Sequence, residues 1–325
     1  MKFAIIGSNY ISDWMLDAGA LCPGFEPYAL YSRTQARARE YGDKRNIPAR
    51  YTDLDALAAD PAVDAVYVAS PTYCHAAQSI QMLRAGKHVL CEKPVCSNER
   101  ELKAMIAAAR EHHVVLLEAM RSEYTPGFAA VRDNLAKLGT LRRATLRFCQ
   151  YSGRYDNFKK GVIENAFKPE LSNGAIMDIG VYVIHAMVSL FGPPQWMQAD
   201  VVKLSNGADG AGSLIFHYPG MQGEIAYSKI TNSAIPSEIQ GEDGNMLIDP
   251  IQNPERVEIR YRDGRSEMVF NQPVPHNMRY EITRFMQYAQ QGVFPEEDLR
   301  KSLDTMAAID AIRERTGIRF PADEG

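Results

Sequence analysis

The first 120 residues alternate short apolar runs with helix-like segments, and this alternation constrains the fold more than any other feature of the chain. The apolar runs are nearly continuous, the strongest being Ala-Val-Tyr-Val-Ala at residues 65–69. Strands that are apolar on both faces and separated by helices are typical of a parallel sheet covered on both sides. We therefore predict a doubly wound α/β domain. Its expected strands are residues 2–7, 28–31, 65–69, 88–91 and 114–118, and its expected helices are residues 11–21, 35–41, 74–85 and 98–112.

The pattern changes after Tyr124, where strand-like stretches follow one another with Gly, Asn and Asp turns between them. Strands in succession without intervening helices predict an antiparallel sheet. We expect a Rossmann domain at residues 1–121 and an α+β domain at residues 122–325 with a mostly antiparallel open sheet, whose final helices could return to the first domain. The expected strands are residues 141–151, 197–204, 212–218, 223–230, 237–240, 246–248, 257–261 and 267–270, and the expected helices are residues 126–137, 175–191, 278–290 and 295–315.

Composition excludes several classes of partner. The chain carries 36 basic and 40 acidic residues, for a net charge of −4, so it lacks the basic excess of a nucleic-acid-binding protein. No segment approaches the roughly 20 apolar residues of a membrane-spanning helix. Five cysteines without a Cys-x-x-Cys pair suit a reducing compartment and do not indicate a metal site. We expect a cytoplasmic protein with no nucleic-acid partner, membrane contact or bound metal.

The turn after the first expected strand reads Gly-Ser-Asn-Tyr-Ile-Ser at residues 7–12. The dinucleotide fingerprint Gly-x-Gly-x-x-Gly/Ala brings backbone amides and a helix N-terminus close to a pyrophosphate. Only its first glycine is present here, although Asn tolerates the left-handed conformation better than most residues. A plain tight turn is the alternative interpretation, but the position between the first strand and the first helix favours a cofactor site. Its expected contacts are Gly7, Ser8, Asn9, Tyr10 and Ile11.

The end of the second expected strand indicates which cofactor would bind. An acidic residue there binds the 2′-hydroxyl of NAD, whereas its absence beside an Arg admits the 2′-phosphate of NADP. This chain has Ser32 and Arg33 at that point, with Arg37 one helical turn later. A solvated basic helix is the alternative. The pattern favours NADP(H) and leaves NAD(H) open.

Three motifs, in order along the chain, resemble the glucose–fructose oxidoreductase/inositol dehydrogenase/MocA (Gfo/Idh/MocA) family of dehydrogenases. They are the turn at residues 7–12, Ser-Pro-Thr-Tyr-Cys-His at residues 70–75, and Glu-Lys-Pro at residues 92–94. The resemblance covers essentially the whole chain, including Asp-Ile-Gly at residues 178–180. The chain departs from the family at Asn9, which stands in place of the second glycine, and at Thr72, which stands in place of an asparagine often found there. It implies further cofactor contacts at Ser70, Pro71, Thr72, His75, Glu92 and Lys93.

By this resemblance Lys93 would contact both the nicotinamide ribose and the substrate hydroxyl. Hydride transfer at a carbinol carbon needs a group that handles the proton on oxygen, and a Lys can serve. Lys93 also follows a parallel strand at its carboxyl end, where open α/β sheets bind ligands. The alternative is a solvent-exposed lysine.

The expected helix at residues 175–191 is almost entirely apolar. Its polar exceptions are Asp178, Tyr182, His185 and Ser189, whose spacing places them on one helical stripe. The stripe lacks Lys, Glu and Arg, so we expect it to face a cleft rather than bulk water. The resemblance matches Asp178 and Tyr182 to the catalytic pair and His185 to a substrate contact. Many family members have His at the position of Tyr182, which leaves open whether Tyr182 or Lys93 delivers the proton.

Residues 154–157, Arg-Tyr-Asp-Asn, form either an exposed loop or a substrate wall that includes Arg154 and Tyr155. Together these features predict an NAD(P)-dependent oxidoreductase that transfers a hydride to or from a carbon of a sugar, polyol or related small carbohydrate-like compound. A glycosidase with tightly bound NAD and a non-catalytic nucleotide sensor are the alternatives. One face of the second sheet should remain apolar and uncovered, which predicts a homodimer or homotetramer.

Overall fold

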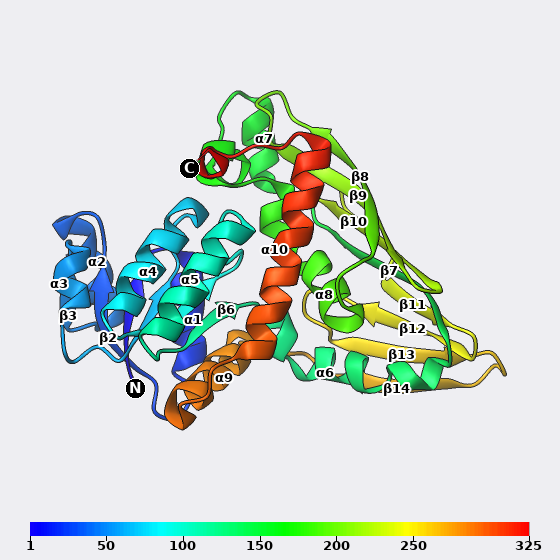
Figure 1. The fold of residues 1–325 in the computed structure, drawn as a ribbon, viewed down its shortest axis with the longest axis horizontal. Coiled ribbons are helices and arrows are strands. Elements are labelled where there is room, and N and C mark those ends of the chain that lie inside the picture. Colours follow the sequence, from blue (N-terminus) through cyan, green and yellow to red (C-terminus); the bar gives the residue numbers. More distant parts are fainter. Residues whose placement is uncertain (325) are drawn as a thin grey trace. The chain divides into compact units, whose positions relative to one another are not determined.

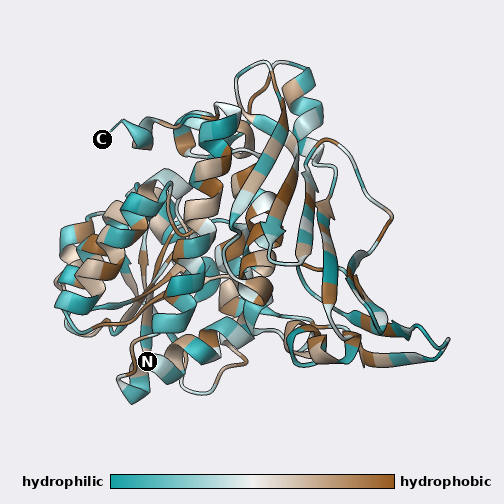
Figure 2. Ribbon diagram, turned by 45° about the vertical axis from the view of Figure 1, so that its right-hand side comes forward, coloured by the Kyte–Doolittle hydropathy of each residue, from teal (hydrophilic) through white to brown (hydrophobic). Residues whose placement is uncertain are grey.

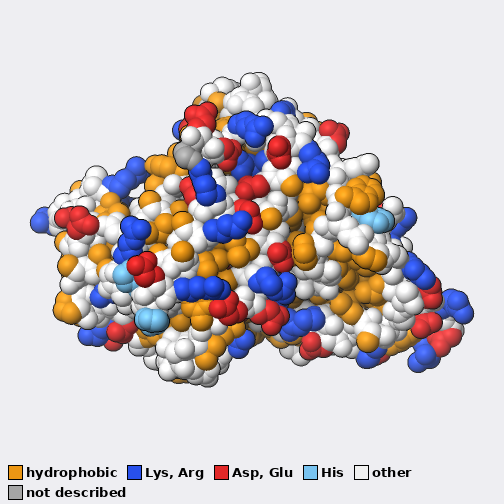
Figure 3. Space-filling view, in the orientation of Figure 1, with side chains coloured by type: hydrophobic (Ala, Val, Ile, Leu, Met, Phe, Trp, Pro, Cys, Tyr) orange, Lys and Arg blue, Asp and Glu red, His pale blue; other side chains and the backbone are white. Residues whose placement is uncertain are grey.

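The computed structural model describes residues 1–324, which divide into two compact units. The first unit contains Met1–Met120 and His276–Leu303, and the second contains Arg121–Pro275 and the chain from Asp304 onward. Figure 1 labels their elements. Among the described residues, no helix combines the length and the apolar composition needed to cross a membrane. On the face shown in Figure 3, acidic and basic side chains are interspersed.

The first unit is built on a six-stranded, entirely parallel sheet in the order β3-β2-β1-β4-β5-β6. Its strands are β1 (Lys2–Ile6), β2 (Glu26–Tyr31), β3 (Ala49–Tyr51), β4 (Ala65–Val68), β5 (His88–Glu92) and β6 (Leu116–Ala119). Its helices are α1 (Tyr10–Gly19), α2 (Gln35–Arg45), α3 (Leu54–Ala58), α4 (His75–Arg84), α5 (Glu99–Glu111) and α9 (Met278–Gln291). The strand order reverses between β1 and β4, the point at which such sheets bind dinucleotides.

The predicted doubly wound sheet is confirmed, with one strand more than expected. The central strands β1 and β4 are apolar on both faces because helices cover both faces of the sheet. In Figure 2, brown strand segments are visible between the helices of this unit. The sequence analysis missed β3 and the short helix α3. Strand β3 has only three residues, all half-buried at the sheet edge, so it carries no apolar run.

The second unit contains an eight-stranded sheet in the order β14-β13-β12-β11-β7-β10-β9-β8, antiparallel throughout except where β10 pairs with β7. Its strands are β7 (Leu141–Cys149), β8 (Trp196–Lys203), β9 (Asp209–Tyr218), β10 (Met221–Ser228), β11 (Ser237–Gly241), β12 (Gly244–Asp249), β13 (Arg256–Tyr261) and β14 (Ser266–Asn271). Its helices are α6 (Pro126–Asp133), α7 (Gly153–Lys159) and α8 (Val181–Phe191). Helix α8 packs on β7 and β10. The predicted mostly antiparallel sheet is therefore confirmed.

Helix α10 (Glu296–Thr316) begins in the first unit and ends in the second.

Two expected elements of the second unit need correction. The helix expected over residues 126–137 ends at Asp133, because Asn134 closes it and a short 3₁₀ turn, Leu135–Leu138, follows. Residues 154–157, interpreted as a loop, lie within helix α7 (Gly153–Lys159).

Candidate active site

Gly7 follows β1 directly and has a backbone conformation that only glycine adopts easily, at φ +120°. A Cβ at this position would lie 2.6 Å from the carbonyl oxygen of Ala69, which follows β4. Glycine therefore allows the turn after β1 to approach the end of β4. This contact places the turn at the switch point of the sheet.

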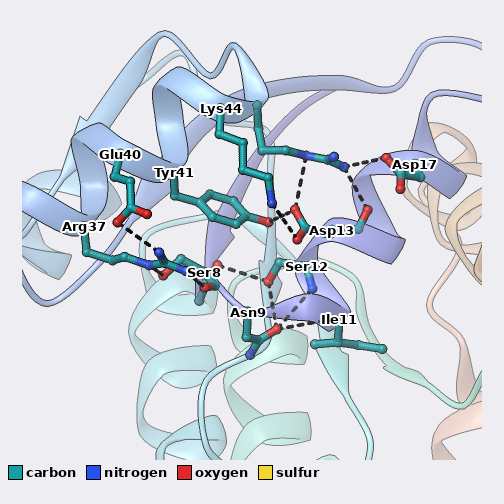
Figure 4. Close-up of polar contacts among 12 residues, drawn as sticks. Ser8, Asn9, Ile11, Ser12, Asp13, Asp17, Arg37, Glu40, Tyr41 and Lys44 are labelled. Carbon is teal, nitrogen blue, oxygen red and sulfur yellow. Dashed lines mark hydrogen bonds and ion pairs between the residues drawn. The ribbon is translucent and has the colours of Figure 1, made fainter.

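Asn9 takes a role other than the one expected of it. Its backbone is extended rather than left-handed, with φ −122° and ψ −179°. Its side-chain oxygen accepts hydrogen bonds from the amides of Ile11 and Ser12 (Figure 4), and its Nδ2 donates to the carbonyl of Ala69 at 2.9 Å. Asn9 is thus the N-cap of α1 and also fastens the helix to the end of β4.

The remaining amides of this turn fit a pyrophosphate. Within residues 1–324, the backbone amides of Ser8, Asn9 and Tyr10 donate no hydrogen bond to protein groups. They lie at the N-terminus of α1, whose dipole favours an anion. The turn therefore retains three donors even though Asn9 closes the next two.

The two arginines near the end of β2 have different surroundings. Arg37 donates to the backbone oxygen and the hydroxyl of Ser8 at 2.6 and 3.0 Å, and it pairs with Glu40 at 3.0 Å (Figure 4). Arg33 is exposed and makes no hydrogen bond or ion pair with any described residue. Arg37 therefore stabilises the turn after β1, whereas the guanidinium of Arg33 is available to a ligand. Ser32, beside it, is nearly buried, and its amide donates to Tyr51.

Lys93 leaves the sheet from a turn that two buried carboxylates hold in place. Glu92 accepts hydrogen bonds from the hydroxyl of Tyr67 and, at 3.1 Å, from the amide of Lys93. Glu118, on β6, accepts the amide of Val95 at 3.1 Å. Carboxylates at the ends of β5 and β6 therefore hold the backbone at Lys93 and Val95, while the Lys93 side chain remains half-exposed.

His75, expected to contact the cofactor, is almost completely buried. Its two ring nitrogens face the carbonyl oxygens of Ser70 and Pro94 at 2.8 and 3.0 Å. Burial lowers the pKa of this imidazole, although both carbonyls oppose the shift. His75 connects the turn after β4 to the turn that carries Lys93.

In the second unit, the segment that carries Asp178 is not a continuous α-helix as expected. Residues Ile176–Gly180 form a π-helical turn, and α8 begins at Val181. Buried Asp209 accepts the amide of Ile176 at 2.7 Å, at the start of the turn. Turns of this type are often found at functional sites.

The polar stripe lies at graded depths. The Asp178 side chain is 33% exposed, whereas Tyr182 and His185 are almost completely buried. The ring of Tyr182 meets Phe148 edge-on at 5.7 Å between centroids. His185, expected to contact substrate, instead faces Glu123 at 3.4 Å and Thr305 at 3.3 Å. The stripe thus runs from a half-exposed carboxylate into the interior of the unit.

The sequence analysis missed Lys229, whose ammonium group contacts the carboxylate of Asp178. A single cation at the end of the apolar stretch at residues 225–230 was the available signal. The residues expected to form a substrate wall also lie on a helix and not on a loop. On α7, Arg154 pairs with Glu164 at 3.5 Å, and the Tyr155 ring packs against Phe158.

Comparison with known proteins identifies the family. A model of the oxidoreductase family with NAD-binding Rossmann fold matches residues 1–120, and a model of the GFO/IDH/MocA C-terminal domain matches residues 128–247. The chain is 45% identical to scyllo-inositol 2-dehydrogenase (NADP(+)) IolU of Bacillus subtilis, over all of this chain and 99% of that protein. The chain belongs to the Gfo/Idh/MocA family. It is also 28% identical to human trans-1,2-dihydrobenzene-1,2-diol dehydrogenase, over 91% of this chain and 90% of that one.

A solved member of similar fold is KijD10, a 3-ketoreductase from Actinomadura kijaniata, in complex with NADP and TDP-benzene. It matches with a TM-score of 0.86 and 25% identity over 98% of both chains. This Gfo/Idh/MocA protein is therefore an NAD(P)-dependent oxidoreductase, as the three sequence motifs predicted. Gly7 and the free amides after it are the features that fit the cofactor. Within residues 1–324, no His, Cys, Asp and Glu side chains are grouped so that they could hold a metal ion.

Proposed function

We propose that this protein is a cytoplasmic NADP(H)-dependent dehydrogenase that interconverts a ring hydroxyl and a ring ketone of an inositol-like cyclic polyol or a related sugar. The observation that carries the proposal is the 45% identity, over the full length of both chains, to a scyllo-inositol 2-dehydrogenase named for NADP. Exposed Arg33, with no carboxylate at the end of β2, supports the choice of cofactor because a guanidinium binds a phosphate in bidentate fashion.

The cofactor would lie along the carboxyl ends of β1, β2 and β4. The amides of Ser8, Asn9 and Tyr10 would bind its pyrophosphate, and Ser32 with Arg33 would bind its 2′-phosphate. When bound, the nicotinamide accepts or donates the hydride. The chain's own residues supply the rest, namely the binding and orientation of the substrate and the transfer of the hydroxyl proton.

We assign the transfer of that proton to a catalytic group of three side chains, Lys93, Asp178 and Tyr182. During oxidation, the substrate hydroxyl loses its proton to this catalytic group while the hydride leaves the carbon that carries the hydroxyl. Reduction reverses both transfers. Lys93 is the better candidate for the proton-handling group, because its side chain is half-exposed and accessible to a ligand, whereas Tyr182 is almost completely buried. Tyr182 would then orient the substrate, and His185 would support α8 from the interior.

Assembly is part of the proposal. Trp196 on β8 and Ile215 on β9 are 45% and 38% exposed, so apolar side chains stand on the outer strands of the second sheet. Such a surface is usually an interface. We propose a homodimer or homotetramer formed through this sheet.

The test is a substrate panel with both cofactors. Purified protein is mixed with NADP⁺ or NAD⁺ and with scyllo-inositol, myo-inositol, glucose or glycerol, and the formation of reduced cofactor is followed by its absorbance. We expect turnover with a cyclic polyol and a higher kcat/KM with NADP⁺. Release of free sugar from a glycoside without net reduction of the cofactor would support a glycosidase, and binding without turnover of any carbonyl or hydroxyl compound would support a sensor.

A further inference from the structure

Lys229 brings a buried positive charge to the segment that carries Asp178. Its side chain is only 4% exposed, and its ammonium group contacts Oδ2 of Asp178. The same nitrogen lies 5.1 Å from the ring centroid of Phe167. An ammonium group that has left water in this way requires a negative partner, because burying an unpaired charge is strongly unfavourable.

The sheet fixes the position of Lys229. The residue follows directly after β10, whose last residue, Ser228, pairs with both β7 and β9. The amide of Lys229 donates to Gly210, and its carbonyl accepts the amide of Ser152, both at 2.9 Å. The backbone from which the ammonium group extends is therefore anchored on two sides.

Asp178 has a less regular foundation. It lies inside the π-helical turn Ile176–Gly180, and its side chain is one-third exposed. A side chain on such a turn can adopt several rotamers unless a contact selects one. Lys229 extends from anchored backbone, so it offers the carboxylate of Asp178 a contact at a fixed position.

We propose that Lys229 is a positioning residue for the reaction, which holds the carboxylate of Asp178 in its direction toward the substrate. This inference rests on the proposed function and deepens it. Lys229 acts through Asp178 and does not touch the substrate. The charge pair belongs to the second unit alone, so Lys229 influences the chemistry without contributing to the cofactor site in the first unit.

The first test compares Lys229→Met with Lys203→Met. Methionine keeps the length of the lysine stem and removes the charge. Lys203 lies on β8 of the same sheet and is exposed, and among the described residues its ammonium group bonds only the backbone carbonyl of Gly317. Lys229→Met should lower kcat by at least about tenfold, since misplacement of a catalytic group is costly. Affinity for NADPH, measured by fluorescence titration, should not change, and Lys203→Met should match the native protein.

The second test is a double-mutant cycle with Asp178→Asn. If Lys229 acts through the charge of Asp178, the double variant should be no slower than Asp178→Asn alone. Losses in kcat/KM that multiply would overturn the proposal, because they would mean that Lys229 has an independent role. Unchanged turnover in Lys229→Met would also overturn it.

The melting temperature gives a readout without substrate. Asp178→Asn leaves a buried ammonium group unpaired and should lower the melting temperature, and adding Lys229→Met should restore part of the loss. If Lys229→Met alone fails to fold, the double variant, which buries neither charge, still allows the comparison with Asp178→Asn. Absence of turnover in the native protein would refute the proposed function instead, while the melting cycle would still report on the ion pair.

Discussion

Asp209 should make the protein less stable as the pH rises from about 4 to about 6. The side chain is fully buried, and burial raises the pKa of its carboxyl from 3.8 to about 6, although the amide of Ile176 opposes the shift. Between these two values the folded chain retains a proton that the unfolded chain has lost. Stability is therefore greatest below the unfolded pKa and falls as the pH passes through the folded one. A shift of this size corresponds to about 3 kcal/mol.

Asp209→Asn is the matching perturbation. The amide oxygen of Asn can still accept the amide of Ile176, but the side chain cannot ionise. Urea unfolding of both proteins from about pH 4 to about pH 8 should show a stability difference that shifts in favour of the variant by about 3 kcal/mol and then levels off above the folded pKa. Asp200→Asn, at an exposed position on β8, makes the same change in net charge and serves as the control. Parallel pH profiles for the native protein and Asp209→Asn would refute the reasoning.

Four further predictions follow from the proposed site. Ser32→Asp should reverse the preference for NADP(H) by repelling the 2′-phosphate, and tighter NAD(H) binding by the native protein in a fluorescence titration would contradict the assignment. Lys93→Ala should lower turnover by at least ~100-fold, and near-native turnover would show that the proton-handling group lies elsewhere. Tyr182→Phe should lower turnover only several-fold, because Tyr182 is proposed to orient the substrate. A loss of turnover equal to that of Lys93→Ala would make the phenol the proton donor. Light scattering should give a mass of at least twice the 36.3 kDa of one chain, and the mass of a single chain would rule out the proposed assembly.

The parallel sheet was predictable because burial on both faces leaves a local signal. Strands β1, β4 and β5 consist almost entirely of buried residues, so each is recognisable as an apolar run. Strand β3 lies at the edge and has no such run, which explains why it was missed. The same holds for α7, whose seven residues include no buried side chain and therefore show no apolar stripe.

The turns that carry the expected functional groups depend on partners distant in the sequence. The π-helical turn at Ile176–Gly180 is held by Asp209, 33 positions after Ile176, and Asp178 meets Lys229, 51 positions later. Periodicity within residues 175–191 cannot report either contact, so an uninterrupted helix was the natural prediction. Asn9 is different, because an Asn directly before a helix is a local N-cap signal. That signal was available, and the interpretation as a left-handed residue overlooked it.

Both units hold their irregular backbone in the same way. Glu92 and Glu118 accept the amides of Lys93 and Val95, and Asp209 accepts that of Ile176. Each is a buried carboxylate that accepts a backbone amide for which the neighbouring strand or helix provides no acceptor. Replacement by an apolar side chain would leave a backbone amide unpaired, at a cost of about 1–3 kcal/mol. Buried ionic groups often add little to stability when an apolar group can replace them. At these positions none can, because the amide needs an acceptor, and the carboxylates therefore determine where the Lys93 and Asp178 side chains begin.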